Sequence, residues 1–200
     1  MIKVIVFDCG GVILSNDWDD PQFYAIPKLL GISWNKATKI FYKHYDSKLK
    51  FGKGSEDEFY KDLIKASKKN ISVKKLRKFY RSLVKKEPAF SMAKKLSRKY
   101  PLYIMNNGVK EWMNLRIKKF HLKKYFEGFV CSAYVGYTKP DKRIYEIMLK
   151  KVKVKPKEIV FIDDRKENVK RARELGINAI LFRGVKQLEK ELLRLGVQID

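Results

Sequence analysis

Hydrophobic positions form two different patterns along this chain. The flanking parts, residues 1–15 and 88–200, alternate short runs of β-branched and other apolar residues with amphipathic segments. Such runs predict strands that are buried on both faces, and their alternation with helices predicts a parallel sheet. The runs that we expect to form its strands are residues 2–7, 102–105, 129–131, 159–162 and 179–182. The expected fold class is therefore α/β, with a Rossmann-like, doubly wound parallel sheet.

The middle part, residues 16–87, carries helical periodicity and no segment with the period of a strand. Helix-start signals recur in it, because Ser33 and Ser72 each precede a stretch with apolar residues at helical spacing. Residues 55–58, Ser-Glu-Asp-Glu, have the pattern of a capping box. We therefore expect an all-helical cap subdomain over residues 16–87, inserted into the α/β core that the two flanking parts form.

Length and composition fit one domain with such an insertion. The chain has 200 residues with 45% hydrophobic residues, which suffices for a core. No apolar run approaches the ~20 residues of a membrane span, and the first residues read as a strand rather than a signal peptide. Cys9 and Cys131 are far apart and lack metal-site spacing, which favours free thiols in a reducing compartment. We expect a cytoplasmic monomer or weak dimer without a membrane partner.

The formal net charge of +24 attracts anions, which suits a phosphorylated substrate. The lysines, however, come in pairs along the whole chain, as in Lys68-Lys69 and Lys118-Lys119. This distribution is typical of a solvated, lysine-rich surface. No nucleic-acid-binding motif accompanies the charge, so a nucleic-acid partner stays open but is not favoured.

Polar residues follow four of the expected strands. Because the carboxyl ends of parallel strands meet at one edge of the sheet, we expect these side chains to converge there. They are Asp8, Asn106, Asn107, Lys139, Asp163 and Asp164. Each of these residues alone would be interpreted as a turn or helix-cap residue, but together at four strand ends they predict a catalytic site. Three neighbouring carboxylates repel one another unless a cation lies among them, and Mg²⁺ suits such ligands. A lysine opposite balances a phosphoryl group, so the set predicts metal-assisted phosphoryl transfer with an Asp nucleophile.

Two glycines, Gly10 and Gly11, come directly after the Asp8 turn begins. Glycine lets the chain turn sharply and leaves backbone N–H groups open to a ligand. We therefore expect both glycines to contribute to phosphate binding, together with Asn106, Asn107 and Lys139.

Four segments in this order carry a resemblance to a known family. The chain resembles the haloacid dehalogenase superfamily of hydrolases, in the phosphatase-like branch with an inserted helical cap. The similar segments are residues 7–13 (FDCGGVI), 104–108 (IMNNG), 136–145 (GYTKPDKRIY) and 160–168 (VFIDDRKEN). The third segment is the most specific, and the resemblance covers essentially the whole chain.

The resemblance implies a role for each chemical group. Asp8 attacks phosphorus and forms an aspartyl-phosphate. Asn106 hydrogen-bonds the transferring phosphoryl group, and Lys139 stabilises the nucleophile and the phosphate charge. The activity implied is that of a phosphatase acting on a small phosphorylated metabolite.

The resemblance also implies a Mg²⁺ site. Asp163 binds the ion together with Asp8 and the backbone carbonyl of Gly10. Asp164 is a second ligand or holds a metal-bound water, and Asn168 braces this loop.

The sequence departs from the family pattern at two positions. The family's phosphatases usually carry a second Asp two residues after the nucleophile, as proton donor and base, where this chain has Gly10. Because general acid–base help contributes ~10²–10⁴-fold, its loss predicts a slow phosphatase or one limited to good leaving groups. Asn106 stands where Ser or Thr is usual, and its NH₂ group can still donate to phosphate.

Two other interpretations stay open. A 2-haloacid dehalogenase-type hydrolase would use the same nucleophile to attack carbon and would need no metal. A catalytically decayed binding or regulatory protein would use the basic surface instead. Substrate identity depends on cap contacts that the sequence does not place.

Overall fold

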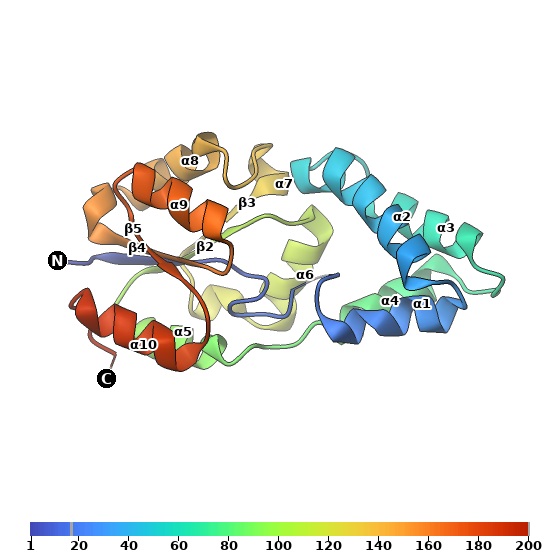
Figure 1. Ribbon diagram of the computed structural model, residues 1–200, viewed down its shortest axis with the longest axis horizontal. Coiled ribbons are helices and arrows are strands. Elements are labelled where there is room, and N and C mark those ends of the chain that lie inside the picture. Colours follow the sequence, from blue (N-terminus) through green and yellow to red (C-terminus); the bar gives the residue numbers. More distant parts are fainter. Residues whose placement is uncertain (17, 200) are drawn as a thin grey trace.

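A five-stranded parallel sheet lies at the centre of the core, with the strand order β3-β2-β1-β4-β5. The computed structural model describes residues 1–16 and 18–199. The strands are β1 (Val4–Phe7), β2 (Leu102–Asn106), β3 (Gly128–Cys131), β4 (Ile159–Asp163) and β5 (Asn178–Leu181). Strand β1 pairs with both β2 and β4, so the first apolar run forms the centre of the sheet (Figure 1). The predicted α/β class is confirmed.

Helices cover both faces of this sheet. On β1, Ile5 and Phe7 point into one hydrophobic cluster, while Val4 and Val6 point into the other. The first cluster packs under α5 (Ala89–Leu96), α6 (Lys110–Lys119) and α10 (Val185–Arg194), and the second under α8 (Lys142–Val152) and α9 (Lys166–Glu174). This arrangement confirms the doubly wound sheet, because each strand is buried on both sides as its apolar run requires.

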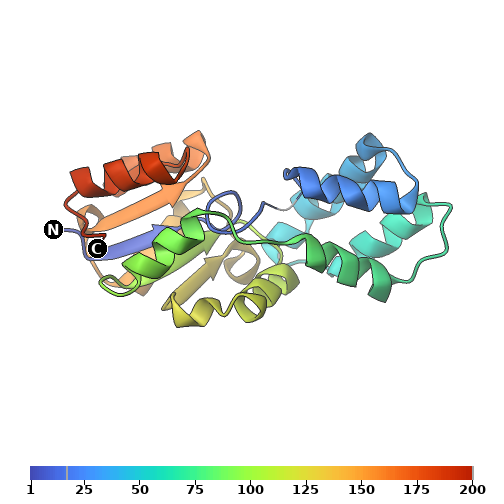
Figure 2. The same cartoon turned by 90° about the horizontal axis from the view of Figure 1, so that it is seen from below.

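The middle part of the chain folds into helices beyond the carboxyl ends of the strands (Figure 2). These elements are η1 (Pro21–Tyr24), α1 (Ala25–Leu30), α2 (Trp34–Ser47), η2 (Leu49–Phe51), α3 (Glu56–Ala66) and α4 (Val73–Leu83). Their aromatic side chains form a shared interior, in which Phe41 stacks on Trp18 with ring centroids 4.8 Å apart. The cap boundaries at residues 16 and 87 stay a prediction.

The chain leaves the core and returns to it along two paired segments. The Ser15 N–H donates to the Lys85 carbonyl at 2.9 Å, and the Glu87 N–H donates to the Ile13 carbonyl at 3.0 Å. The Ser15 hydroxyl also accepts from the Lys85 N–H at 3.0 Å. Residues 13–15 and 85–87 thus form a hydrogen-bonded connection between core and cap.

One local detail differs from the sequence expectation. Ser55 caps α3 by accepting from the Asp57 N–H at 3.1 Å, but Glu58 pairs with Lys48 instead of closing a capping box. The segment after β3 begins with the short helix α7 (Ser132–Val135). The remaining short elements of the described chain are the 3₁₀ turns η3 (Leu122–Lys124) and η4 (Pro156–Glu158).

Across the described residues, every helix is too short or too polar to cross a membrane.

Candidate active site

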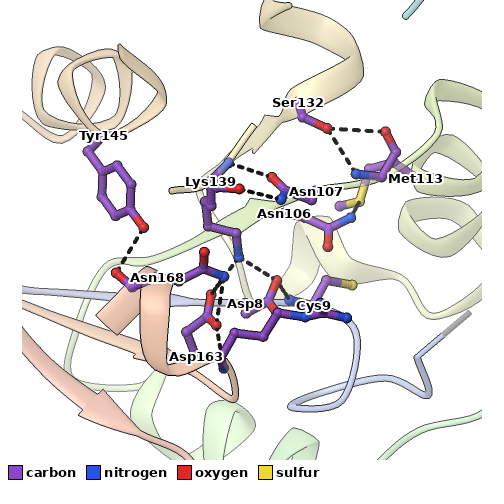
Figure 3. A network of polar contacts seen from close by, with 12 residues as sticks. Asp8, Cys9, Asn106, Asn107, Met113, Ser132, Lys139, Tyr145, Asp163 and Asn168 are labelled. Carbon is purple, nitrogen blue, oxygen red and sulfur yellow. Dashed lines mark hydrogen bonds and ion pairs between the residues drawn. The ribbon is translucent and has the colours of Figure 1, made fainter. Parts of the chain in front are cut away.

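The polar strand-end residues do converge at one edge of the sheet. Lys139 Nζ lies 2.8 Å from Asp8 Oδ1 and 2.7 Å from Asp163 Oδ2, so that one ammonium group bridges two carboxylates (Figure 3). Asp8 follows β1, Asp163 ends β4, and Lys139 lies in the loop after α7. All three side chains are buried, which strengthens their mutual interaction.

The backbone of Lys139 is held by Asn107. The Lys139 N–H donates to Asn107 Oδ1 at 2.8 Å, and Asn107 Nδ2 donates to the Lys139 carbonyl at 2.9 Å. Both ends of this amide are therefore engaged with the neighbouring loop (Figure 3). The Asn107 side chain thus positions the lysine, and a phosphate contact of Asn107 stays a prediction. The cap reaches the same residue, because the Tyr45 hydroxyl donates to the Asn107 carbonyl at 3.2 Å.

Asp163 has both carboxylate oxygens occupied by donors. Oδ1 accepts from the Arg165 N–H and from Asn168 Nδ2, each at 2.9 Å. Oδ2 accepts from Asn168 Nδ2 at 3.0 Å and from Lys139 Nζ. Asn168 is itself fixed by Tyr145, whose hydroxyl donates to its carbonyl at 2.9 Å. Asn168 thus braces the acidic loop, in the manner that the sequence led us to expect.

Asp164 differs from Asp163 in its bonding. Its Oδ1 is buried and has no hydrogen-bond partner in the described structure. Oxygen atoms of Asp8, Asp163 and Asp164 all lie within 4.8 Å of one another. A buried carboxylate oxygen without a donor is costly unless a cation approaches it. The three carboxylates therefore fit a hard divalent cation such as Mg²⁺.

The two glycines after β1 have different roles. Gly11 has a φ of +75°, and a side chain there would begin 2.7 Å from Asp164 Oδ2, so this position requires glycine. Its N–H donates to the Leu14 carbonyl at 2.8 Å. This bond lies within the turn, and phosphate binding by Gly11 stays a prediction. Gly10 and the buried Asn106, by contrast, both line the cleft above the site.

Burial and charge shift the titration of the site. Burial raises the pKa of Asp8 to about 7, Lys139 opposes this shift, and Asp163 and Asp164 add to it. Burial disfavours the charged form of Lys139, but Asp163 and Asp8 outweigh it and raise the pKa of this lysine above its ordinary value. Burial, followed by the charge of Asp163, also raises the pKa of Asp164. A divalent cation would relieve the repulsion and return Asp8 to the carboxylate form that a nucleophile needs.

A cleft with a volume of about 240 Å³ separates these residues from the cap. The cap lines it mainly from α2 and the turn behind it, with Phe41, Tyr42, Tyr45, Asp46 and Lys50. Helical spacing marks Phe41 and Tyr45 as inward-facing, but the sequence does not reveal that this face lines a cleft. Arg116 of α6 is a further lining residue that the sequence analysis missed, because an arginine in a polar helix reads as a surface residue.

Comparison with known proteins places the chain in a family. A model of haloacid dehalogenase-like hydrolases matches residues 2–176, and the chain belongs to this family. It is 28% identical to D-ribitol-5-phosphate phosphatase of Bacteroides thetaiotaomicron over 186 residues, 88% of this chain and 89% of that protein. It is also 35% identical to flavin mononucleotide hydrolase 1 of Arabidopsis thaliana over 89 residues, which are 44% of this chain and 36% of that protein. The second match thus spans about a third of the plant protein.

Solved structures agree with this assignment. A HAD family enzyme from Bacteroides thetaiotaomicron, in complex with magnesium and inorganic phosphate, superposes with a TM-score of 0.76. The match covers 92% of this chain and 95% of that chain at 24% identity, which shows a common fold. The expected family and fold are confirmed, and the chain is a hydrolase by family.

Proposed function

We propose that this chain is a Mg²⁺-dependent phosphatase that acts on a small phosphorylated metabolite through an aspartyl-phosphate on Asp8. The observation that carries the proposal is the buried cluster in which Lys139 bridges Asp8 and Asp163. Beside it lies Asp164 Oδ1, a buried oxygen without a hydrogen-bond partner in the part of the chain that the structure describes. Such a cluster supplies a nucleophile, a cation site and a balancing positive charge. Metal-assisted phosphoryl transfer requires these same three parts.

The bonding pattern favours a particular division of labour among the carboxylates. Asp8 and Asp164 would hold Mg²⁺ directly together with the Gly10 carbonyl, since Asp164 Oδ1 has no hydrogen-bond partner among the described residues. The oxygens of Asp163 already accept hydrogen bonds from Lys139 and other donors. Asp163 would therefore position the lysine and attract the ion by its negative charge rather than by a direct bond to it. This assignment reverses the order that the sequence suggested for the two acidic residues. The bound ion would neutralise charge on the transferring phosphoryl group.

Phosphate recognition would fall to three groups. Lys139 Nζ faces the nucleophile and offers charge, and the Asn106 amide can donate from the end of β2. The Gly10 backbone borders the same space. Asn107 would act on phosphate binding indirectly, because its two hydrogen bonds to the Lys139 backbone hold that lysine in place.

The cleft suggests the size of the substrate. Ligand pockets typically measure ~300–1,000 Å³, so a cleft of about 240 Å³ favours a phosphate ester no larger than a phosphorylated sugar or polyol. The similarity to D-ribitol-5-phosphate phosphatase supports a substrate of the size of a small phosphorylated carbohydrate. A cytoplasmic location and a monomeric or weakly dimeric state stay predictions.

A phosphate-release assay tests the proposal. The wild-type chain should release inorganic phosphate from members of a panel that includes ribitol 5-phosphate, sugar phosphates and acetyl phosphate, and EDTA should abolish the release. Asp8→Asn should abolish it as well, because the amide cannot attack phosphorus. Glu189→Gln, an equivalent change at an exposed position on α10, should leave it unchanged.

Other outcomes would support the alternatives. The proposal would be overturned if the wild-type chain released no phosphate in a Mg²⁺-dependent way, or if Asp8→Asn left that release intact. Halide release from a 2-haloacid in EDTA would support dehalogenase chemistry. Salt-sensitive nucleic-acid binding that survives Asp8→Asn, without any turnover, would support a decayed site used for binding.

A further inference from the structure

The space beside the nucleophile, next to Gly10, is filled by the side chain of Asn16. A Cβ placed on Gly10 would lie 2.8 Å from Asn16 Oδ1 and 3.4 Å from the Asn16 Cα. The turn after β1 brings this residue back over the site, because the Leu14 N–H donates to the Cys9 carbonyl at 2.9 Å. Both Gly10 and Asn16 line the catalytic cleft. The Asn16 amide therefore borders the space that a side chain at residue 10 would enter.

The orientation of this amide is fixed by Asp19. Asn16 Nδ2 donates to Asp19 Oδ2 at 3.0 Å, and Asn16 Oδ1 lies on the side of Gly10. Asp19 is held in turn by two more elements, since Arg165 Nη2 lies 3.0 Å from Oδ2 and the Tyr42 hydroxyl lies 3.3 Å from Oδ1. The loop, the cap helix α2 and the start of α9 thus meet at one carboxylate. This arrangement makes Asn16 part of a built structure rather than a mobile side chain.

The chemistry of an amide differs from that of a carboxyl group at this place. A carboxamide oxygen accepts a hydrogen bond, but an amide does not act as a Brønsted acid or base near neutral pH. It can orient an attacking water, but it cannot protonate a leaving oxygen. A leaving oxygen that receives no proton must be weakly basic, whereas an alkyl oxygen departs slowly without a proton donor.

We propose, building on the phosphatase function above, that Asn16 is a catalytic residue that orients the water attacking the aspartyl-phosphate. We further infer that the natural substrate carries its phosphate on a weakly basic oxygen, either an acyl or an anomeric one. Asp19 is then a positioning residue, which acts through its bond to Asn16 Nδ2.

The two steps balance without a protein acid. In the first, the Asp8 oxygen bonds to phosphorus, the bond to the leaving oxygen breaks, and that oxygen departs with the electron pair and takes a proton from solvent. In the second, the water oxygen bonds to phosphorus and the bond between phosphorus and the Asp8 oxygen breaks. The electron pair returns to the Asp8 carboxylate. One water proton stays on the phosphate and the other passes to bulk water.

A matched pair of substrates tests this inference with the wild-type protein. Glucose 1-phosphate and glucose 6-phosphate have the same size and charge but carry phosphate on an anomeric and an alkyl oxygen. The expected ratio of kcat/KM is at least ~10² in favour of the 1-phosphate, the lower end of what a general acid contributes. Acetyl phosphate is the third substrate, and its kcat/KM relative to that of glucose 1-phosphate distinguishes an acyl phosphate from an anomeric phosphate as the natural substrate. Equal turnover of both glucose phosphates would overturn the inference.

Substitutions at Asn16 give an independent readout. Asn16→Asp restores a carboxyl group of the same size and should raise kcat/KM for glucose 6-phosphate by about tenfold or more, without raising it for acetyl phosphate. Asn16→Ala should slow decay of the phosphoprotein, so that phosphorylated Asp8 accumulates during turnover of acetyl phosphate. Asp19→Asn should show the same accumulation in weaker form.

The outcomes separate this inference from the function on which it rests. Unchanged phosphoprotein decay in Asn16→Ala would overturn the role of Asn16. If the wild-type protein is active but its kcat/KM does not depend on the leaving group, the inferred substrate class is wrong and the phosphatase function still holds. No Mg²⁺-dependent release from any substrate would overturn the phosphatase itself.

Discussion

A buried carboxylate in the cap, Glu56, provides the sharpest test of how cap and core are held together. It is 3% exposed, and its Oε2 accepts from Trp112 Nε1 at 2.7 Å and from the Tyr60 hydroxyl at 3.3 Å. Its Oε1 pairs with Arg81 and lies 3.2 Å from Arg77 Nε. Because Trp112 belongs to α6 of the core, one cap carboxylate ties the two parts together.

Glu56→Gln keeps the size of the side chain and removes its charge. Breaking a buried ion pair costs about 3–5 kcal/mol, and a lost hydrogen bond to a charged group costs about 1.5–3 kcal/mol. Gln retains one acceptor oxygen, so we expect a loss of about 3 kcal/mol in the free energy of unfolding. At about 2–4 °C per kcal/mol for a chain of this size, Tm should fall by about 6–12 °C.

Urea unfolding followed by tryptophan fluorescence, together with a thermal scan, measures this loss. Glu58→Gln is the matched control, because its 3.7 Å contact with Lys48 is half exposed and should contribute no more than about 0.5 kcal/mol. If Glu56→Gln and Glu58→Gln lower stability by equal amounts, the buried carboxylate does not hold the cap to the core and this reasoning fails.

Three further predictions concern the site and its surroundings. Burial raises the pKa of Asp8 to about 7 in the folded protein, so folding favours its protonated form, and in EDTA this group should make the protein less stable as pH rises from about 4 to about 7. The difference in unfolding free energy between wild type and Asp8→Asn, measured at each pH, checks this sign, and Mg²⁺ should flatten the slope. Gly52→Ala should lower the free energy of unfolding by at least about 1 kcal/mol more than Gly136→Ala. Both glycines have positive φ, but only at Gly52 would the added Cβ clash with a backbone carbonyl oxygen, that of Ala133 in α7. Equal losses for the two variants in urea unfolding would contradict this contact. Asn168→Ala removes the donor to both Asp163 oxygens and should cost about 1.5–3 kcal/mol and weaken Mg²⁺ binding in calorimetry, whereas unchanged affinity would show that the brace is dispensable.

The sequence predicted those parts of the site that depend on the sheet alone. Buried apolar runs identify parallel strands, and parallel strands bring their carboxyl ends to one edge, so Asp8, Lys139 and Asp163 could be expected to meet. The inserted helices could be predicted for the same reason, because their period differs from that of strands. These inferences need only local pattern and topology.

Contacts between distant segments could not be predicted in this way. Nothing in the local pattern indicates that Glu56 reaches Trp112, since the two residues lie on separate helices and the contact depends on how the cap docks. We predict phosphate contacts for Asn107 and Gly11 from their positions, but the local pattern does not reveal that the Asn107 amide bonds the Lys139 backbone or that the Gly11 N–H bonds the Leu14 carbonyl. The sequence does not indicate Asn16 as a site residue, because only the folded turn brings it back over Gly10.

The most direct test of the central claim is to trap the phosphorylated protein. Wild-type protein turning over acetyl phosphate with Mg²⁺ would be quenched in acid, digested and analysed by mass spectrometry. We predict one added phosphoryl group on the peptide that contains Asp8, absent in EDTA and in Asp8→Asn. Steady phosphate release with no phosphoryl group on Asp8, or with the group on another residue, would contradict the account.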